Sequence, residues 1–447
     1  MRYAPPGLCV NDFALLSNDG VYTLLHLQGP WTDRFDHLHM ETSYGRAVST
    51  DLVAWEPQGT AFGVGLPGRF DQQAVWTMHP VPYGEGLAMF YTGVQTLTAG
   101  GWPLQAVGLA VSDRRDGTAW RRRGTGPVVR ADPRWYRTGE SMGWRDPFVV
   151  RDDEGTGWAM AVCASDASLP VEVSGCVGFA TSPDLTHWQV HPPLISPGDI
   201  DQLECPVLER TGDGWLLLGC LGSANRFDAW SAPRLRGPWE HLGPAGPPGA
   251  YAPRVMVAPD GARVVLHTTP RRVGLRDSGD FCRGMLAQPK VLTVAPGGAA
   301  GTTARLEWWN GLDNWLEQPT DRPVLHAVGD IDITGSAEVV LRTDNGSPAL
   351  VVHCDATHVR VTGTGGSPLQ EAALTQPVRR LRILTVGEYV EVYADGVFIL
   401  TTLCYSGRPV TWTETVAGSA RSVPVRPVRL PVPHRDDASA IWPGPAT

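Results

Sequence analysis

Short runs of apolar and alternating residues, each following a turn, recur along the first three hundred residues of the chain. The turn glycines are Gly20, Gly86, Gly155, Gly214 and Gly261, separated by 66, 69, 59 and 47 residues. Apolar strands on either side of such turns are typical of β-hairpins. A β unit repeated at this length predicts a β-propeller of five blades, each of about four strands.

A second repeat keeps step with the first. Segments that end in tryptophan follow four of the hairpins, at Trp55, Trp120, Trp188 and Trp239. The distance from each turn leaves room for one or two more strands, so these segments are expected in the outer part of each blade. A β-sandwich with similar turns is the alternative, but a sandwich does not require two markers to recur in phase.

From about Val324 the pattern changes to alternating strands without this unit. Residues 388–393 and 397–403, joined through Ala394, Asp395 and Gly396, predict a hairpin. We therefore expect an all-β protein with two domains. A five-bladed propeller would cover residues 1–318, and a β-sandwich ending in an extended tail rich in proline and arginine would cover residues 319–447.

Composition narrows the possible functions. The 51 glycines and 39 prolines among 447 residues disfavour long helices. The net charge is −9 and no basic stripe occurs, so neither nucleic acid nor a membrane is an expected partner. The sequence shows no secretory leader or membrane-spanning segment, which predicts a cytoplasmic protein. The eight scattered cysteines are expected to be reduced core residues rather than a disulfide or metal framework.

Three acidic residues lie at similar places in their units. Asp12, Asp146 and Glu204 precede their turn glycines by 8, 9 and 10 residues. The first strand of each blade lines the central channel of a propeller, so the three carboxyl groups are expected to meet there. Each acid alone is explained as well by a turn residue that accepts backbone hydrogen bonds. Three equivalent positions favour a shared site.

Clustered carboxyl groups suit the hydrolysis of a glycosidic bond. One protonates the leaving oxygen and another attacks or activates water, while a third can stabilise the transition state. Arg145 is expected to donate hydrogen bonds to sugar hydroxyls and to hold an acid ionised. Indole rings pack against sugar faces, so the tryptophans nearest the predicted channel are candidate pocket walls: Trp31, Trp76 and Trp144.

These motifs resemble glycoside hydrolase family 32, the invertase, inulinase and levanase family. The family's Trp-Met-Asn-Asp-Pro-Asn-Gly motif is matched by CVNDFAL, and its Tyr-Gln-Tyr-Asn-Pro motif by HLQGP. Its Arg-Asp-Pro is intact, and its Glu-Cys and a YAPR segment follow in order. In the second domain, RRLRILTVGEYVEVYADGVFILTT is similar to the family's sandwich signature. The resemblance therefore covers nearly the whole chain.

The resemblance implies a five-bladed propeller with a β-sandwich, and a retaining mechanism that uses neither a metal nor an organic cofactor. Asp12 would be the nucleophile, Glu204 the general acid and then base, and Asp146 the transition-state stabiliser. The other matched residues would complete the sugar pocket: Asn11, Gln28, Arg145, Cys205 and Tyr251.

The expected substrate is a small saccharide, most simply a β-fructofuranoside such as sucrose or a short fructan, cleaved from its end. Departures from the family pattern at Phe13, in the segment 75–78 and at Gly249 leave the acids unchanged but alter their surroundings. They keep open a related furanosidase, for example one acting on arabinofuranosides, and an enzyme that transfers the glycosyl unit to another acceptor. A non-catalytic carbohydrate-binding protein is a further alternative, which the complete set of acids disfavours.

Overall fold

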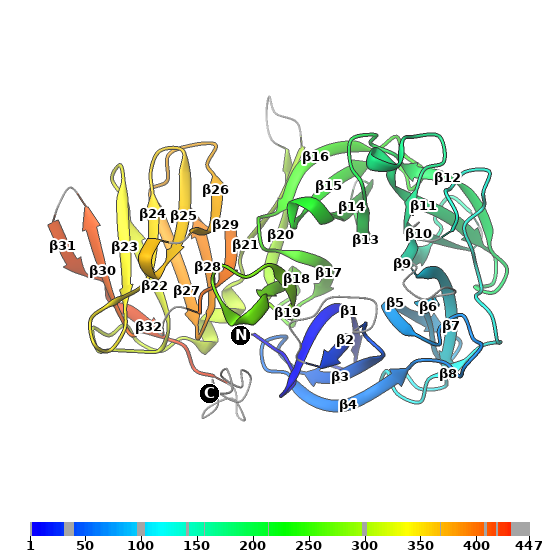
Figure 1. The fold of residues 1–447 in the computed structure, drawn as a ribbon, viewed down its shortest axis with the longest axis horizontal. Helices are drawn as coiled ribbons and strands as arrows, with labels where there is room; N and C mark the ends of the chain where they lie inside the picture. Colours follow the sequence, from blue (N-terminus) through cyan, green and yellow to red (C-terminus); the bar gives the residue numbers. More distant parts are fainter. Residues whose placement is uncertain are drawn as a thin grey trace.

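The structure is a computed structural model that describes residues 2–30, 40–95, 103–139, 143–155, 157–212, 214–296, 302–366, 368–405, 409–416 and 419–430. Within these ranges the chain folds into β-strands joined by turns and short 3-10 segments (Figure 1). An all-β fold is therefore confirmed. None of the helical segments described is long and apolar enough to span a membrane.

Sixteen strands form four successive groups, in each of which the strands pair antiparallel in chain order. The first group holds β1 (Leu8–Asn18), β2 (Val21–Pro30), β3 (Ser43–Ser49) and β4 (Glu56–Gly63), and the second holds β5 (Ala74–Tyr83), β6 (Gly86–Gln95), β7 (Leu104–Ser112) and β8 (Arg121–Arg122). The third holds β9 (Trp144–Arg151), β10 (Trp158–Ser165), β11 (Gly175–Ser182) and β12 (Gln189–Ile195), and the fourth holds β13 (Leu203–Thr211), β14 (Gly214–Leu221), β15 (Arg226–Ala232) and β16 (Glu240–Gly246).

Both sequence repeats mark the positions predicted for them. Each turn glycine lies at the turn, or at the first residue after it, between the first and second strands of a group. Each tryptophan of the second repeat immediately precedes the fourth strand. In all four, the indole N–H donates to a carbonyl three or four residues earlier, at 2.9–3.2 Å. The repeated tryptophans therefore close the turn that leads into the outermost strand.

The first strands of the groups surround a common centre. After β16 come β17 (Tyr251–Val257), β18 (Arg263–Arg272) and β19 (Phe281–Leu286), and β19 also pairs with β1. The strands β1, β5, β9, β13 and β17 contact one another in that order, and β17 contacts β1 again. Figure 1 shows this closed arrangement on the right. Residues far apart in the sequence are thereby brought to one place.

The rest of the chain forms two antiparallel sheets that share a core. One sheet holds β22 (His326–Asp332), β27 (Arg380–Val386), β28 (Tyr389–Ala394) and β29 (Val397–Leu403), with β32 (Val425–Pro427) on its edge. The other holds β23 (Ala337–Arg342), β24 (Pro348–Cys354), β25 (His358–Gly363), β26 (Pro368–Ala373), β30 (Thr411–Val416) and β31 (Ser419–Ser422). The predicted hairpin is present as β28 and β29, and part of the expected extended tail pairs as β32.

The two parts meet at a junction of strand pairing and apolar packing, because one apolar cluster includes residues of both. β20 (Lys290–Pro296) pairs with β21 (Thr302–Trp308), and β21 pairs with β29. The backbone at Gly249, with φ of +91°, passes so close to Thr401 that a Cβ would lie 2.1 Å from its carbonyl oxygen. The glycine that departs from the family pattern is therefore required by this contact.

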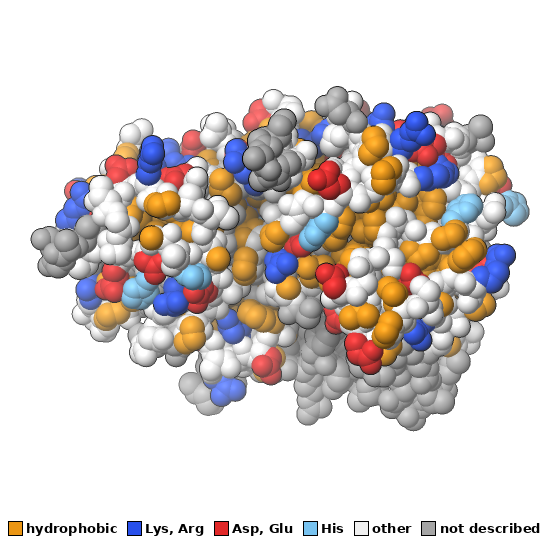
Figure 2. Space-filling view, turned by 90° about the horizontal axis from the view of Figure 1, so that it is seen from above, with side chains coloured by type: hydrophobic (Ala, Val, Ile, Leu, Met, Phe, Trp, Pro, Cys, Tyr) orange, Lys and Arg blue, Asp and Glu red, His pale blue; other side chains and the backbone are white. Residues whose placement is uncertain are grey.

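The face of the molecule seen in Figure 2 carries no continuous basic stripe, as the net charge of −9 led us to expect. On the face seen in Figure 2, basic side chains are scattered singly among acidic ones, and apolar side chains gather between them. Seven of the eight cysteines are buried, and Cys282 is partly exposed. Their burial agrees with the prediction of core residues, and their reduced state remains a prediction.

A buried ion pair at the junction yields a stability prediction. The Lys290 ammonium, which is fully buried, pairs with Glu391 of β28 and donates to the Gln288 carbonyl at 2.8 Å. Tyr393 donates to the other carboxylate oxygen at 2.6 Å. Lys290→Met leaves a buried carboxylate without its cation, so the free energy of unfolding should fall by about 3–5 kcal/mol. Urea unfolding measures this loss.

The control is the exposed pair of Arg360 and Glu371, at 2.9 Å. Arg360→Met should lower the unfolding free energy by less than about 1 kcal/mol, because water already solvates both charges. Equal losses in the two variants would contradict the assigned role of Lys290.

Candidate active site

Each of the five inner strands contains an extra residue near its beginning. The register shifts lie between Val10 and Phe13 in β1, between Trp76 and Met78 in β5, after Arg145 in β9, between Glu204 and Val207 in β13, and between Tyr251 and Arg254 in β17. Asp146, Cys205 and Ala252 lie in these bulges with φ of +58°, +48° and +48°. Bulges re-aim side chains and are common beside active sites.

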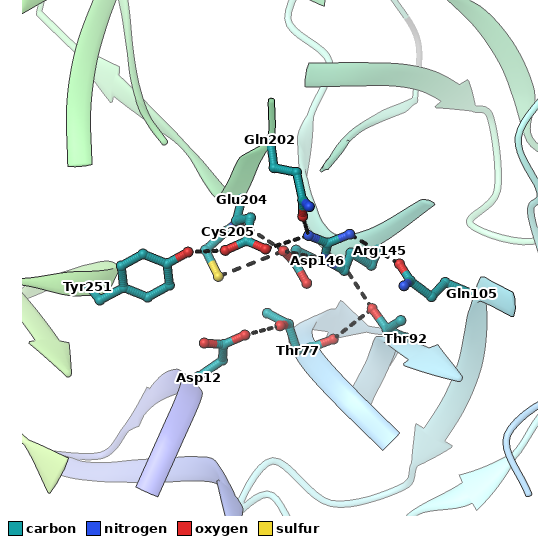
Figure 3. Close-up of polar contacts among 10 residues, drawn as sticks. All are labelled: Asp12, Thr77, Thr92, Gln105, Arg145, Asp146, Gln202, Glu204, Cys205 and Tyr251. Atoms are coloured by element: carbon teal, nitrogen blue, oxygen red, sulfur yellow. Dashed lines mark hydrogen bonds and ion pairs between the residues drawn. The ribbon is translucent and has the colours of Figure 1, made fainter. Parts of the chain in front are cut away.

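The bulges correct the predicted register of the acids. Arg145, Glu204 and Tyr251 occupy the paired position just before the bulge, whereas Asp146 and Cys205 occupy the bulge itself. Glu204 is therefore equivalent to Arg145 and not to Asp146, so the expectation of three equivalent positions is wrong. Asp12 is the second residue of the bulge in β1, so the three acids occupy three successive positions. They meet nevertheless, because these positions are adjacent and face the same centre (Figure 3).

The three residues before the bulges form a continuous hydrogen-bonded row (Figure 3). The Arg145 guanidinium pairs with one carboxylate oxygen of Glu204, and the Tyr251 hydroxyl donates to the other. Arg145 also donates to the side-chain oxygen of Gln105 at 3.2 Å and to that of Gln202. Glu204 is thus fixed from two sides, while 23% of its side chain remains exposed.

The other two acids lie deeper. Asp146 accepts a hydrogen bond from the Cys205 backbone N–H at 3.0 Å, and its own N–H donates to the Thr92 hydroxyl oxygen at 2.9 Å. Asp12 accepts a hydrogen bond from the Thr77 hydroxyl. A carboxylate oxygen of Asp12 lies within 4.8 Å of one of Asp146. Two carboxyl groups therefore share one poorly solvated space.

Burial and mutual repulsion shift the ionisation of this cluster. Burial, followed by the negative charge of Asp146, raises the pKa of Asp12 to about 7, although the Thr77 hydrogen bond and the Arg254 charge act in the opposite direction. Burial also raises the pKa of Glu204, against the nearby Arg145 charge. Both shifts favour the protonated form, so this group of acids readily holds a proton. Such a group can supply both a carboxylic acid and a carboxylate.

A metal ion is the other use of clustered acids. Asp12, Asp146 and the Cys205 sulfur form a described group whose candidate ligand atoms lie within 4.8 Å of one another. However, the Asp146 Oδ2 atom already accepts the Cys205 N–H, and two arginine charges act on the acids. We assign no metal here, and the absence of a cofactor remains a prediction.

Two predicted pocket residues contact the first group of strands. The Asn11 side-chain amide donates to Glu41 at 3.3 Å. The Gln28 amide donates to the hydroxyls of Thr60 at 2.9 Å and Ser43 at 3.2 Å. Asn11 immediately precedes Asp12 in β1, while Gln28 pairs with Val10 across from it. Both flank the acids and contact none of them in the hydrogen bonds described.

The three predicted tryptophan walls have different outcomes. Trp76 is half-buried and immediately precedes Thr77 in β5. Its role as a pocket wall therefore stays a prediction. Trp144 is only 2% exposed and its ring lies 4.9 Å from that of Tyr136 within an apolar cluster. We interpret Trp144 as a core residue, which corrects the prediction of a pocket wall. Trp31 lies outside the described residues.

Sequence reasoning missed five residues that contact or act on the acids or on Arg145: Thr77, Thr92, Gln105, Gln202 and Arg254. Thr77 and Arg254 lie in segments that the sequence singled out, but nothing in the sequence indicated which of their side chains meet Asp12. Gln105 and Gln202 are isolated polar residues without a motif. Their role depends on which strands are neighbours.

Comparisons with known proteins agree with this geometry. Residues 3–214 match the model of the glycosyl hydrolases family 32 N-terminal domain. Sucrose-6-phosphate hydrolase of Klebsiella pneumoniae is 26% identical over 416 residues, which cover 83% of this chain and 81% of that protein.

Solved structures share the fold over the whole chain. Exo-inulinase from Aspergillus awamori has a TM-score of 0.73 and 15% identity, with 96% of this chain and 97% of that chain covered. A mutant of the Bombyx mori family 32 β-fructofuranosidase in complex with sucrose has a TM-score of 0.71 and 17% identity, covering 95% and 92%. The resemblance to glycoside hydrolase family 32 is thus confirmed, and the chain is a relative of those enzymes.

Proposed function

We propose that the protein is a retaining, exo-acting glycosidase that cleaves β-fructofuranosides such as sucrose or short fructans. The observation that carries the proposal is the meeting of Asp12, Asp146 and Glu204, from three different inner strands, in one buried cluster. The sucrose-bound β-fructofuranosidase and the sucrose-6-phosphate hydrolase named above support a small saccharide as substrate.

The finer architecture belongs to the same proposal. We take β1–β4, β5–β8, β9–β12 and β13–β16 as four blades and β17–β19 as part of a fifth. The boundary between the propeller and the sandwich is placed at residues 318 and 319, between β21 and β22. A cytoplasmic location is proposed from the sequence alone.

In the first step, Glu204 protonates the glycosidic oxygen while the Asp12 carboxylate attacks the anomeric carbon. The bond to the leaving group breaks and a covalent glycosyl ester with Asp12 forms. Burial raises the pKa of both acids, which favours the protonated form that Glu204 needs for this step. At Asp12 the Thr77 hydrogen bond and the Arg254 charge act against that rise and favour the ionised form that attacks.

In the second step, Glu204, now ionised, takes a proton from water, and the water oxygen attacks the anomeric carbon. The ester bond breaks and the sugar leaves with its original configuration. Asp146, held by the Cys205 N–H, is proposed to accept hydrogen bonds from the sugar hydroxyls as positive charge develops on the ring. Arg145 and Tyr251 keep Glu204 in place through both steps.

The product analysis that tests this proposal uses sucrose, inulin, levan and an aryl α-arabinofuranoside. We expect fructose from the first three, released as single units and initially as the β-anomer, because two inversions retain configuration. NMR spectra recorded in the first minutes distinguish the anomers, and chromatography identifies the sugars. Arabinose without fructose would favour the arabinofuranoside alternative, and glycosyl transfer would yield longer saccharides instead of free fructose.

Asp12→Asn separates an enzyme from a binding protein. The amide cannot form the glycosyl ester, so the turnover of sucrose should fall by several orders of magnitude, in the range of about 10⁴-fold. Sucrose binding, measured by calorimetry, should persist. The control is Asp19→Asn at the exposed β1–β2 turn, which should leave turnover unchanged. Equal turnover in wild type and Asp12→Asn would contradict the assigned nucleophile.

The ionisation of Asp12 predicts the acidic side of the pH profile. Below its raised pKa, Asp12 carries a proton and cannot attack, so kcat/KM should fall toward acid from a midpoint well above the ordinary range of aspartate. Thr77→Val removes a hydrogen bond to the ionised form and should move that midpoint upward. Thr77→Ser keeps the hydroxyl and should not. Superimposable profiles for the valine variant and wild type would remove Thr77 from this role.

A further inference from the structure

The residue that follows the bulge is of a different type in one of the five inner strands. The residue that follows the bulge is a buried apolar one in four strands: Phe13 in β1, Met78 in β5, Phe148 in β9 and Val207 in β13. In β17 the equivalent residue is Arg254, and it is 3% exposed. A permanently charged group therefore occupies the apolar floor under the acids.

Arg254 is poorly satisfied by its described neighbours. One terminal nitrogen donates to the Pro253 carbonyl at 2.7 Å, and the guanidinium carbon lies 5.8 Å from the centre of the Phe148 ring. The Nε and the other terminal nitrogen have no hydrogen-bond partner among the residues described. Burying an arginine in this way costs free energy unless a nearby anion compensates. The anions that can compensate the Arg254 charge are those of the carboxylate cluster, since this charge acts on Asp12.

The two arginines of the site interact with different acids. Arg145 contacts Glu204 directly, and its Nε lies 3.6 Å from Asp146. Asp12 has no such ion pair among the described contacts, and its hydrogen bond comes from the neutral Thr77. The Arg254 charge is the cationic influence on Asp12, and it lowers the pKa of that carboxyl against burial and the acidic neighbours.

The other ionisable groups around Asp12 and Arg254 come from every neighbouring inner strand and from β3. They are Asp146 of β9, Glu204 and Cys205 of β13, Tyr44 of β3 and His79 of β5. Burial and then the Arg254 charge lower the pKa of His79 to about 3, so this imidazole is neutral and adds no positive charge. Burial raises the pKa of Tyr44. Neither group therefore adds a positive charge beside Arg254, and the other cation of the cluster, Arg145, pairs with Glu204 and Asp146.

We propose that Arg254 is a positioning residue of the reaction, the buried counter-cation that holds Asp12 as an anion once the sugar fills the site. The inference rests on the proposed function, because it is the attack on the anomeric carbon that requires this anion. A bound sugar excludes water from the cluster and removes the solvation that otherwise supports a carboxylate. A fixed charge beneath Asp12 then replaces that solvation at the moment of attack.

The test follows the titration of Asp12 itself in the full-length protein. Carbon-13 labelling of aspartate carboxyl groups, with the Asp12 signal identified by its absence in Asp12→Asn, gives the midpoint by NMR. Arg254→Met should raise this midpoint by about one pH unit or more, and Arg254→Lys should restore most of it. The acidic limb of kcat/KM for sucrose should move in the same direction. A purely structural role would lower kcat at every pH without moving the limb.

Arg236→Met is the matched control, because Arg236, between β15 and β16, pairs with Asp152 of the β9–β10 turn at 2.7 Å and should leave the Asp12 midpoint unchanged. If Arg254→Met does not fold, Arg254→Gln removes the charge while keeping a hydrogen-bond donor. A folded neutral variant with an unshifted midpoint overturns the inference. A shifted midpoint in a protein that hydrolyses no furanoside overturns the proposed function instead, and leaves Arg254 as the counter-cation of Asp12.

Discussion

Repulsion among carboxyl groups in a space with little water is the constraint on which this structure depends. Asp12 and Asp146 approach within 4.8 Å, and Glu204 is hydrogen-bonded in the same cluster. Three negative charges there would cost several kcal/mol without compensation. The fold compensates with the Cys205 N–H at Asp146, the Thr77 hydroxyl at Asp12, and Arg145 at both Glu204 and Asp146. In our proposal, Arg254 supplies the countercharge of Asp12. This arrangement is what allows adjacent acids to differ in protonation.

The five inner strands contact one another in a closed circle, which brings the three acids together. The bulges then determine which side chains of each strand face the centre. A regular strand would present Glu204 and Cys205 to opposite faces. The left-handed backbone at Asp146 and Cys205, which costs about 1–3 kcal/mol at each residue, lets consecutive residues serve the same centre. Strain in the backbone thus accompanies the placement of the acids, as is usual where a site requires geometry that a regular sheet lacks.

Much of this could be predicted from local patterns. Turn glycines and tryptophans reveal hairpins and outer strands because both act within a few residues of their position. Pairing between distant strands is not local, so the partners of Arg145 could not be predicted, although Arg145 itself was. The shift between the acids was present in their spacings of 8, 9 and 10 residues to the turn glycines, but these were treated as equal. What spacing alone could not show is that a bulge lets adjacent residues face the same centre. Trp144 was misplaced since a tryptophan beside the centre and one within a core have the same sequence signal.

The three acids differ in how far they are exposed to solvent, and this difference indicates the side from which the leaving group and water approach. The side chain of Glu204 is 23% exposed, whereas that of Asp146 is 3% exposed and Asp12 is 9% exposed. A group that protonates a departing alcohol and then activates water needs access to both, and a nucleophile needs neither. In the proposed mechanism, the leaving group therefore departs past Glu204, along the side where Gln202 lies exposed before β13. Residues on that side, and not the acids beneath, then determine whether water or a second sugar receives the glycosyl unit.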